Sequence, residues 1–291
     1  MVSKTRKINR VEKFFETYSS HTTGTYRWVL KKFFSSIYGN GKLENQVERY
    51  FSGERDYEED VSSFFVKIRD EAPLTVINEL AVVRVFLSSQ DVNLPPKFWR
   101  DLRRRRKGSR ALTQDRIPSH AELRSILNHM DIKGRALFLT LASSGMRIGE
   151  IMMLKLSDIN LECEPAKIRL RGEYCKNGNP RTVFISKEAR EAVKEFFKIR
   201  ESYIKSAARR SHLYPQGSVD DRIFPFSTAN AMVMWHGALR KAGLDARDSS
   251  TNWRELHIHV LRKFFSTQME YKIPKCIIEA LMGHEGYLDG A

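Results

Sequence analysis

The chain has 291 residues, enough for one large domain or two ordinary ones with substantial cores. Its 50 Lys and Arg residues outnumber 35 Asp and Glu, and the resulting net charge of +15 predicts an extended polyanion as partner, with nucleic acid ahead of membrane lipid. No apolar run has membrane-spanning length and the start lacks the apolar core of a signal peptide, so a membrane or secreted protein is not expected and a cytoplasmic location is.

Neither the positive charge nor the cysteines are concentrated in one segment. Residues 1–110 hold 22 Lys and Arg against 14 Asp and Glu, and the remainder holds 28 against 21, as expected if both parts touch the same polymer. Cys163, Cys175 and Cys276 are odd in number and widely spaced. This spacing fits neither a zinc site nor a disulfide framework and indicates a reducing compartment.

The first part of the chain has the apolar spacing of several short helices. Such spacing occurs over residues 9–20, 26–37, 57–70 and 74–89. The Ser/Thr/Gly-rich segment after residue 18 is interpreted as a break, with Thr22 or Thr23 capping the second helix. Val-rich residues 81–86 also fit a strand on propensity alone. The pattern predicts a small all-helical domain over residues 1–107.

Two groups of basic side chains in this part are candidate DNA contacts. They are Arg27, Lys31 and Lys32 on the second helix, and Arg103, Arg104, Arg105, Arg106 and Lys107 in the basic run that leads into a basic linker over residues 108–117. Such a strap would follow a phosphate backbone and displace counterions, without reading sequence because phosphates carry no base identity. The alternative is a solvated charge run with no ligand.

The second part opens with a capping box, in which Ser119 begins a helix and Glu122 follows three residues later. An apolar helix through residues 136–141 leads into the segment Ser-Ser-Gly-Met-Arg-Ile-Gly-Glu, residues 143–150. Its first glycine permits a tight turn and delivers Arg147 to the start of the next helix, where unpaired backbone N–H groups favour an anion. Alternatively, Arg147 only forms an ion pair with Glu150 on the same helix.

A β-hairpin is predicted next, because residues 166–171 and 181–186 alternate apolar and polar side chains. Asn177-Gly178 between them is typical of a tight turn, and Lys176 lies beside its tip. A ribbon of this kind would carry Lys176 into a groove of a ligand. The alternative is an ordinary solvated lysine.

Helices are predicted over residues 187–207, 228–243 and 273–282, with polar loops at 209–222 and 245–254. The stretch 257–265 is interpreted as a further helix whose buried stripe is Leu261, Phe264 and Phe265. His259 and Arg262, three residues apart, would share a second face suited to a phosphate oxyanion. His284 follows the last helix beside a glycine, where it either binds a ligand or caps helical carbonyls.

Together these segments resemble the tyrosine recombinase, or phage integrase, family. The resemblance rests on residues 144–150, the hairpin Lys176, His259-Val260-Leu261-Arg262 and Leu281-Met282-Gly283-His284, with residues 172–178 similar to archaeal members. It covers residues 113–291, whereas residues 1–107 resemble the family's core-binding domain only in size and character. It implies a mainly α fold with a small β-sheet or hairpin, in which an N-terminal all-α bundle precedes a catalytic domain over residues 118–291.

The resemblance also implies a role for each candidate side chain in DNA transesterification. Arg147 and Arg262 would bind the nonbridging oxygens of the scissile phosphate, which His284 would also hydrogen-bond. Lys176 would protonate the 5′-oxygen leaving group, and His259 would assist proton transfer at the nucleophile. Glu150 would orient Arg147. The energy of the cut bond would be kept in a 3′-phosphotyrosyl link. No metal or other cofactor is expected, and the expected partners are double-stranded DNA and further copies of the chain in a tetramer.

One feature departs from the family pattern. The nucleophilic tyrosine normally lies about nine residues beyond the histidine of the Gly-His motif. Tyr287 follows His284 by three residues, within the expected turn, so it is not expected to be the nucleophile, which would lie beyond residue 291 in a truncated chain. Two alternatives remain: a DNA-binding relative without catalysis, and a metal-dependent nuclease using His257, His259 and His284.

Overall fold

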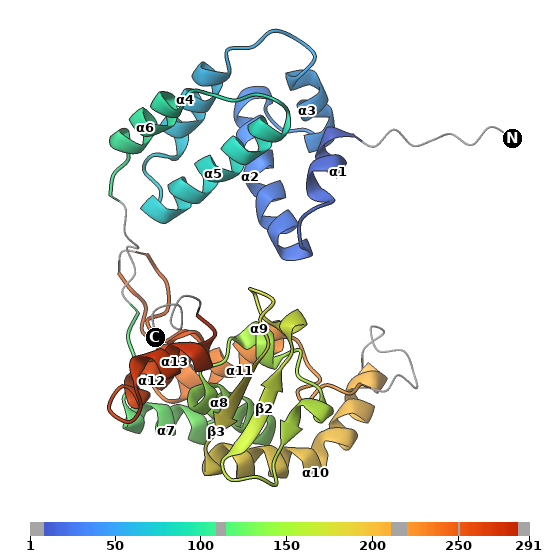
Figure 1. Ribbon diagram of the computed structural model, residues 1–291, viewed down its shortest axis with the longest axis vertical. Coiled ribbons are helices and arrows are strands. Elements are labelled where there is room, and N and C mark those ends of the chain that lie inside the picture. Colours follow the sequence, from blue (N-terminus) through green and yellow to red (C-terminus); the bar gives the residue numbers. More distant parts are fainter. Residues whose placement is uncertain (1–8, 109–114, 211–219, 250, 285–291) are drawn as a thin grey trace, which may run out of the picture. The chain divides into compact units, whose positions relative to one another are not determined.

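The computed structural model describes residues 9–108, 115–210, 220–249 and 251–284. The chain divides into two compact units, Met1–Leu112 and Thr113–Ala291, each described by itself (Figure 1). No helix in the described ranges combines the length and apolar character needed to cross a membrane.

Helices make up the first unit. They are α1 (Arg10–Phe15), α2 (Ser20–Tyr38), α3 (Leu43–Tyr50), α4 (Tyr57–Ile68), α5 (Pro73–Ser89) and α6 (Pro96–Arg105). Side chains of Asn9, Ser19 and Asp56 accept backbone N–H groups at the starts of α1, α2 and α4, and prolines begin α5 and α6. The core is aromatic, with rings of Phe33, Phe34 and Phe86 fully buried.

Two local predictions for this unit were wrong in detail. Ser19, not Thr22 or Thr23, caps the second helix, so the Ser/Thr/Gly segment forms its first turns rather than a break. The predicted helix over residues 74–89 is present as α5, and the strand that residues 81–86 also fitted is not formed, because α5 buries Val82, Val83 and Phe86 on the core side. The basic run begins on α6, whose last turn contains residues 103–105, and these cations suit the negative end of the helix dipole.

The second unit is built around α8. Its helices are α7 (His120–Asn128), α8 (Ile132–Ser144), α9 (Ile148–Ile151), α10 (Lys187–Arg210), α11 (Thr228–Lys241), α12 (Val260–Met269) and α13 (Lys275–Met282). The predicted capping box of Ser119 and Glu122 is present at the start of α7. Helix α8 is buried on nearly all sides because it packs against α7, α10, α12 and strand β3.

A three-stranded antiparallel sheet lies in this unit: β1 (Ile159–Asn160), β2 (Ala166–Leu170) and β3 (Arg181–Ile185). The predicted hairpin is present, with Ile168 opposite Val183 and Leu170 opposite Arg181, whereas the short β1 was not predicted. The turn closes with a hydrogen bond from the Gly178 N–H to the Cys175 carbonyl. The predicted fold class, mainly α with a small sheet, is confirmed.

Candidate active site

The site begins at the turn between α8 and α9. Gly145 has φ +65°, and a Cβ atom there would lie 2.4 Å from the Phe265 ring, so both backbone conformation and packing require glycine. The turn places Arg147 at the residue that precedes α9, where the helix dipole favours negative charge. The predicted position of Arg147 at a helix start is therefore found.

Glu150 fixes the Arg147 side chain. Its carboxylate accepts the Arg147 guanidinium at 2.9 Å and the Arg147 backbone N–H at 2.8 Å. Burial alone would raise the pKa of Glu150, but hydrogen bonds from Arg181 and Arg147 outweigh it, and the pKa is lowered. The glutamate is therefore an anion at neutral pH, and Arg147, with 28% of its side chain exposed, remains accessible to a ligand.

Arg262 lies on α12 and is buried, not on a solvent face. Its Nη1 donates to the Gly145 carbonyl at 2.6 Å, and its Nη2 donates to the Met282 carbonyl at 2.5 Å and to His284 Nε2 at 2.8 Å. Burial and the nearby charge of Arg147 lower the pKa of Arg262 to about 10, so the guanidinium stays charged at neutral pH. One buried cation thus joins α8, α12 and α13.

His284 follows the left-handed Gly283 at the end of α13, as predicted. Its backbone N–H donates to the Glu279 carbonyl at 3.0 Å, and its Nδ1 is hydrogen-bonded to the Glu279 carboxylate. Because Nε2 faces Arg262, the imidazole itself binds other side chains and does not cap the helical carbonyls. The ring is thereby held from both of its nitrogen atoms.

His259 precedes α12 by one residue. The predicted helix over 257–265 is shorter than expected, because residues 257–259 form a turn and α12 begins at Val260. The predicted stripe of Leu261, Phe264 and Phe265 is buried as expected. The Arg262 N–H donates to the His259 carbonyl at 3.1 Å, so the spacing of three still brings the two residues together. Partial burial of the ring and the charge of Arg262 lower the pKa of His259.

Lys176 lies on the turn of the hairpin and is exposed. Within the described residues, no hydrogen bond or ion pair joins it to the arginines or histidines above. Its neighbour Cys175 is buried, and the Cys175 sulfur accepts a hydrogen bond from Arg181 at 3.3 Å. Cys175 therefore contacts Arg181 of the same hairpin, while the side chain of Lys176 remains exposed.

The assembled site is suited to an oxyanion. Arg262 and His284 are hydrogen-bonded to each other, the charge of Arg147 lowers the pKa of Arg262, and the charge of Arg262 lowers the pKa of His259, although these residues are spread over the chain from 147 to 284. Guanidinium groups donate several N–H bonds in a fixed plane that matches the oxygens of phosphate. In a partly buried setting such fixed donors stabilise charge that develops on a reacting phosphate more strongly than water does.

Comparison with known proteins identifies the family. The sequence profile of the Phage integrase family matches residues 112–287, which is more than half of the chain. The chain belongs to this family. Tyrosine recombinase XerC from Roseiflexus castenholzii is 28% identical to it over 196 residues, covering 62% of this chain and 56% of that relative.

A second relative and a solved structure agree with this membership. Tyrosine recombinase XerD from Rickettsia conorii is 25% identical over 187 residues, covering 59% of this integrase-family chain and 58% of the relative. The chain thus spans little more than half the length of these relatives. The structure of the Tn1549 transposon integrase in complex with transposon right end DNA is 15% identical, with a TM-score of 0.64, and covers 96% of this chain and 91% of that one. This likeness shows a shared fold.

Two residues of the site were missed from the sequence. Arg181 donates to both oxygens of Glu150, and Glu279 binds His284. Strand alternation contained a signal for Arg181, because it shares the inward face of β3 with Val183 and Ile185. Glu279 gave a weaker signal as a single acidic residue within an apolar helical segment.

The histidines of the nuclease alternative do not form a metal site. His257 binds Asp115 at 3.0 Å, and Asp115 also pairs with Lys263 at 2.6 Å. His284 binds Glu279 and Arg262. In the described ranges, no group of three or more His, Cys, Asp or Glu side chains is arranged to hold a metal ion. The donor geometry therefore gives the nuclease interpretation no support.

The candidate DNA contacts of the first unit lie in different environments. Arg27 pairs with Glu44 at 2.8 Å, and Lys32 bonds the fully buried Glu79 at 2.8 Å, whereas Lys31 is exposed. In the basic run, residues 103–105 and Lys107 are exposed and Arg106 is partly buried. Residues 109–114 of the predicted linker and Tyr287 lie outside the described residues.

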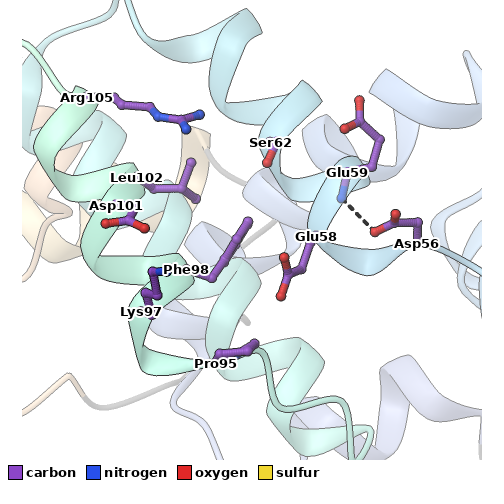
Figure 2. A pocket seen from close by; sticks show the side chains of 10 residues that line it. All are labelled: Asp56, Glu58, Glu59, Ser62, Pro95, Lys97, Phe98, Asp101, Leu102 and Arg105. Carbon is purple, nitrogen blue, oxygen red and sulfur yellow. Dashed lines mark hydrogen bonds between the residues drawn. The ribbon is translucent and has the colours of Figure 1, made fainter.

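A hollow of about 490 Å³ in the first unit contains none of the candidate catalytic residues. Figure 2 shows that α6 contributes Phe98 and Leu102 on one side, and α4 and its preceding residue contribute Glu58 and Asp56 on the other. The Asp56 carboxylate accepts the Glu59 N–H, and Glu58 and Glu59 lie in the first turn of α4. These carboxylates therefore stabilise the positive end of that helix.

Proposed function

We propose that the chain is a site-specific DNA recombinase or integrase that breaks and rejoins double-stranded DNA by transesterification without a metal. The observation that carries this proposal is the hydrogen-bonded network in which Arg262 joins the Gly145 turn, the end of α13 and His284, with Arg147 close enough to lower the pKa of Arg262. Two fixed cations of this kind neutralise a phosphorane-like transition state without a bound ion.

The proposed roles follow from these positions. Arg147 and Arg262 bind the nonbridging oxygens, and His284 hydrogen-bonds the same phosphate. His259, whose lowered pKa favours the neutral ring at pH 7, assists proton transfer from the attacking hydroxyl. Lys176 protonates the 5′-oxygen as the hairpin turn moves against DNA. None of the described tyrosines is proposed as the nucleophile that forms the 3′-phosphotyrosyl link, and Tyr287 lies outside the described residues.

Double-stranded DNA is the proposed substrate, and the first unit is proposed to be a core-binding domain. Support comes from the net charge of +15, from the similarity to the tyrosine recombinases XerC and XerD and from the DNA bound to the Tn1549 integrase. A homotetramer on DNA belongs to the same proposal, because recombination cuts and rejoins all four strands of two duplexes. The proposal also includes a cytoplasmic location. Arg103, Arg104, Arg105, Arg106 and Lys107 are proposed to contact phosphates, together with Arg27, Lys31 and Lys32.

The decisive experiment is covalent capture. The protein is expressed from the complete reading frame that encodes it. Duplexes that bind it are first selected from a random-sequence DNA library. The protein is then incubated with the selected duplexes in the presence of EDTA. A denaturation-resistant protein–DNA adduct attached through a 3′-phosphate supports the proposal. Free nicks that require a divalent cation support the nuclease instead, and tight binding without adduct supports a relative that has lost catalysis.

A further inference from the structure

Arg181 lies at the start of β3 with only 9% of its side chain exposed, and it is the residue through which three elements of the candidate site meet. Its Nη1 and Nη2 donate to the two oxygens of Glu150 at 3.1 and 2.7 Å. Its Nε donates to the Leu281 carbonyl at 2.8 Å, and its Nη1 also reaches the Cys175 sulfur at 3.3 Å. The partners belong to α9, to the end of α13 and to the hairpin.

Glu150 is saturated by this arrangement. Each of its oxygens accepts one bond from Arg181 and one from Arg147, so the carboxylate has no freedom to rotate. Glu150 in turn directs the Arg147 guanidinium. Removing Arg181 would leave a buried anion held by Arg147 alone, and the Arg147 side chain would then follow the carboxylate as it relaxed.

At the other end, Arg181 and Arg262 bind successive carbonyls, Leu281 and Met282, at the negative end of α13. The contact with α13 is close, because a Cβ atom on Gly283 would lie 2.7 Å from the Arg181 guanidinium. Arg181 therefore fixes the distance between the turn that carries Arg147 and the helix end that carries His284.

We propose that Arg181 is a positioning residue, which holds Arg147 in the orientation that phosphate binding requires and does not itself bind phosphate. Four of its five N–H groups are already used by Glu150, Leu281 and Cys175, and the side chain is almost enclosed. One remaining N–H cannot make the paired donation to phosphate oxygens proposed for the other two arginines. Arg262 keeps two N–H groups beyond its described bonds, and Arg147 is partly exposed. The proposal rests on the proposed function only in naming phosphate as the ligand that Arg147 binds.

The first test measures Arg147 directly and does not depend on activity. The Nε–H order parameter of Arg147 is measured by NMR in the full chain and in Arg181→Met, with Thr182→Ala, its exposed neighbour, as control. We expect the order parameter to fall by about 0.2–0.3 in Arg181→Met, to recover partly in Arg181→Lys and to stay unchanged in Thr182→Ala. An unchanged Arg147 in a folded Arg181→Met protein overturns the proposal.

The second test is a double-mutant cycle on the rate of adduct formation. Arg181→Met should slow the reaction by about 10–100-fold while the Kd for DNA changes less than about threefold. In the Arg147→Ala background the same change should slow it less than about threefold, because the residue acts through Arg147. The assignment would be contradicted if the rate reductions of Arg181→Met and Arg147→Ala multiply in the double variant, or if Arg181→Met weakens DNA binding as much as it slows the reaction. If the parent chain forms no adduct although Arg147 loosens, the proposed function fails and the positioning role stands.

Discussion

Nη2 of Arg262 lies 2.8 Å from Nε2 of His284, and this contact fixes the tautomer of the imidazole. Since a guanidinium group only donates, Nε2 must accept, and the ring proton resides on Nδ1, from which it is donated to the Glu279 carboxylate. Without DNA, His284 therefore holds Arg262 in place. A donor role toward phosphate requires a proton on Nε2 in place of this contact.

Arg262→Ala should abolish most cleavage while DNA binding persists. The substitution removes a donor to the transition state and leaves the Gly145 and Met282 carbonyls unpaired. Loss of one such fixed donor typically slows a reaction by about 10²–10³-fold. The measurement is single-turnover adduct formation beside a DNA titration. Equal loss of rate and affinity would place Arg262 in ordinary binding instead.

Lys176→Met should be rescued by a better leaving group. If Lys176 protonates the departing 5′-oxygen, its loss should slow cleavage by about 10²–10⁴-fold, and DNA with sulfur at that bridging position should react nearly normally, because a thiolate leaves without a proton. The matched control is Lys167→Met, an exposed lysine on β2 of the same hairpin. A defect that the sulfur substrate does not relieve would exclude Lys176 as the general acid.

The local elements of this site were predictable, but the contacts between them were not. Capping by Ser119, the hairpin and the stripe of Leu261 and Phe264 depend on spacings within a few residues, which a sequence displays directly. The bond from Arg181 to Leu281 spans 100 residues, and no periodicity encodes it. Likewise, α12 begins later than expected because the carbonyls of residues 257–259 accept N–H groups three residues later, as in a 3-10 turn, and the sequence pattern does not distinguish this from an α-helix.

His259 should make the cleavage rate fall at acidic pH, which appears as an acidic limb in the pH–rate profile. Its pKa is lowered in the folded chain, so the neutral ring that accepts a proton is lost only as the pH falls below the ordinary value of about 6.5. In that window the unfolded state binds more protons, so the free energy of unfolding also decreases with falling pH. His259→Gln should remove both effects, measured as rate and unfolding against pH.

His236 provides the control for this pH dependence. Burial and the charge of Arg254 lower its pKa as well, so it contributes to stability with the same sign. His236→Gln should flatten the stability profile and leave the acidic limb of cleavage intact. A limb that persists in His259→Gln, or disappears in His236→Gln, would contradict the role given to His259.

Gly145→Ala should destabilise the second unit by about 2–4 kcal/mol. The new methyl group would meet the Phe265 ring at 2.4 Å, and the left-handed backbone adds strain. Gly149→Ala is the matched control, because a Cβ there meets nothing within 4 Å; its effect should stay within about 1 kcal/mol. The free energy of unfolding of both variants is measured with denaturant. Equal values would show that the Phe265 ring can move away from the new methyl group without loss of stability.

Two adjacent lysines of α2 should separate stability from DNA binding. Lys32 neutralises Glu79, which is fully buried; burial raises the pKa of that carboxyl and Lys32 opposes the shift. Lys32→Met should therefore cost roughly 2–4 kcal/mol, below the full range for a buried pair because 29% of the lysine side chain is exposed.

Lys31, one residue earlier, is exposed, so Lys31→Met should leave unfolding unchanged within about 0.5 kcal/mol. If Lys31 contacts a phosphate, the slope of log K for DNA against log salt should fall by about 1, since one fewer counterion is released. The pair is informative because both variants remove the same charge from the same helix. An unchanged slope in Lys31→Met would exclude that phosphate contact. If the affinity of Lys32→Met for DNA decreases only in proportion to its fraction of folded protein, Lys32 contributes to stability alone.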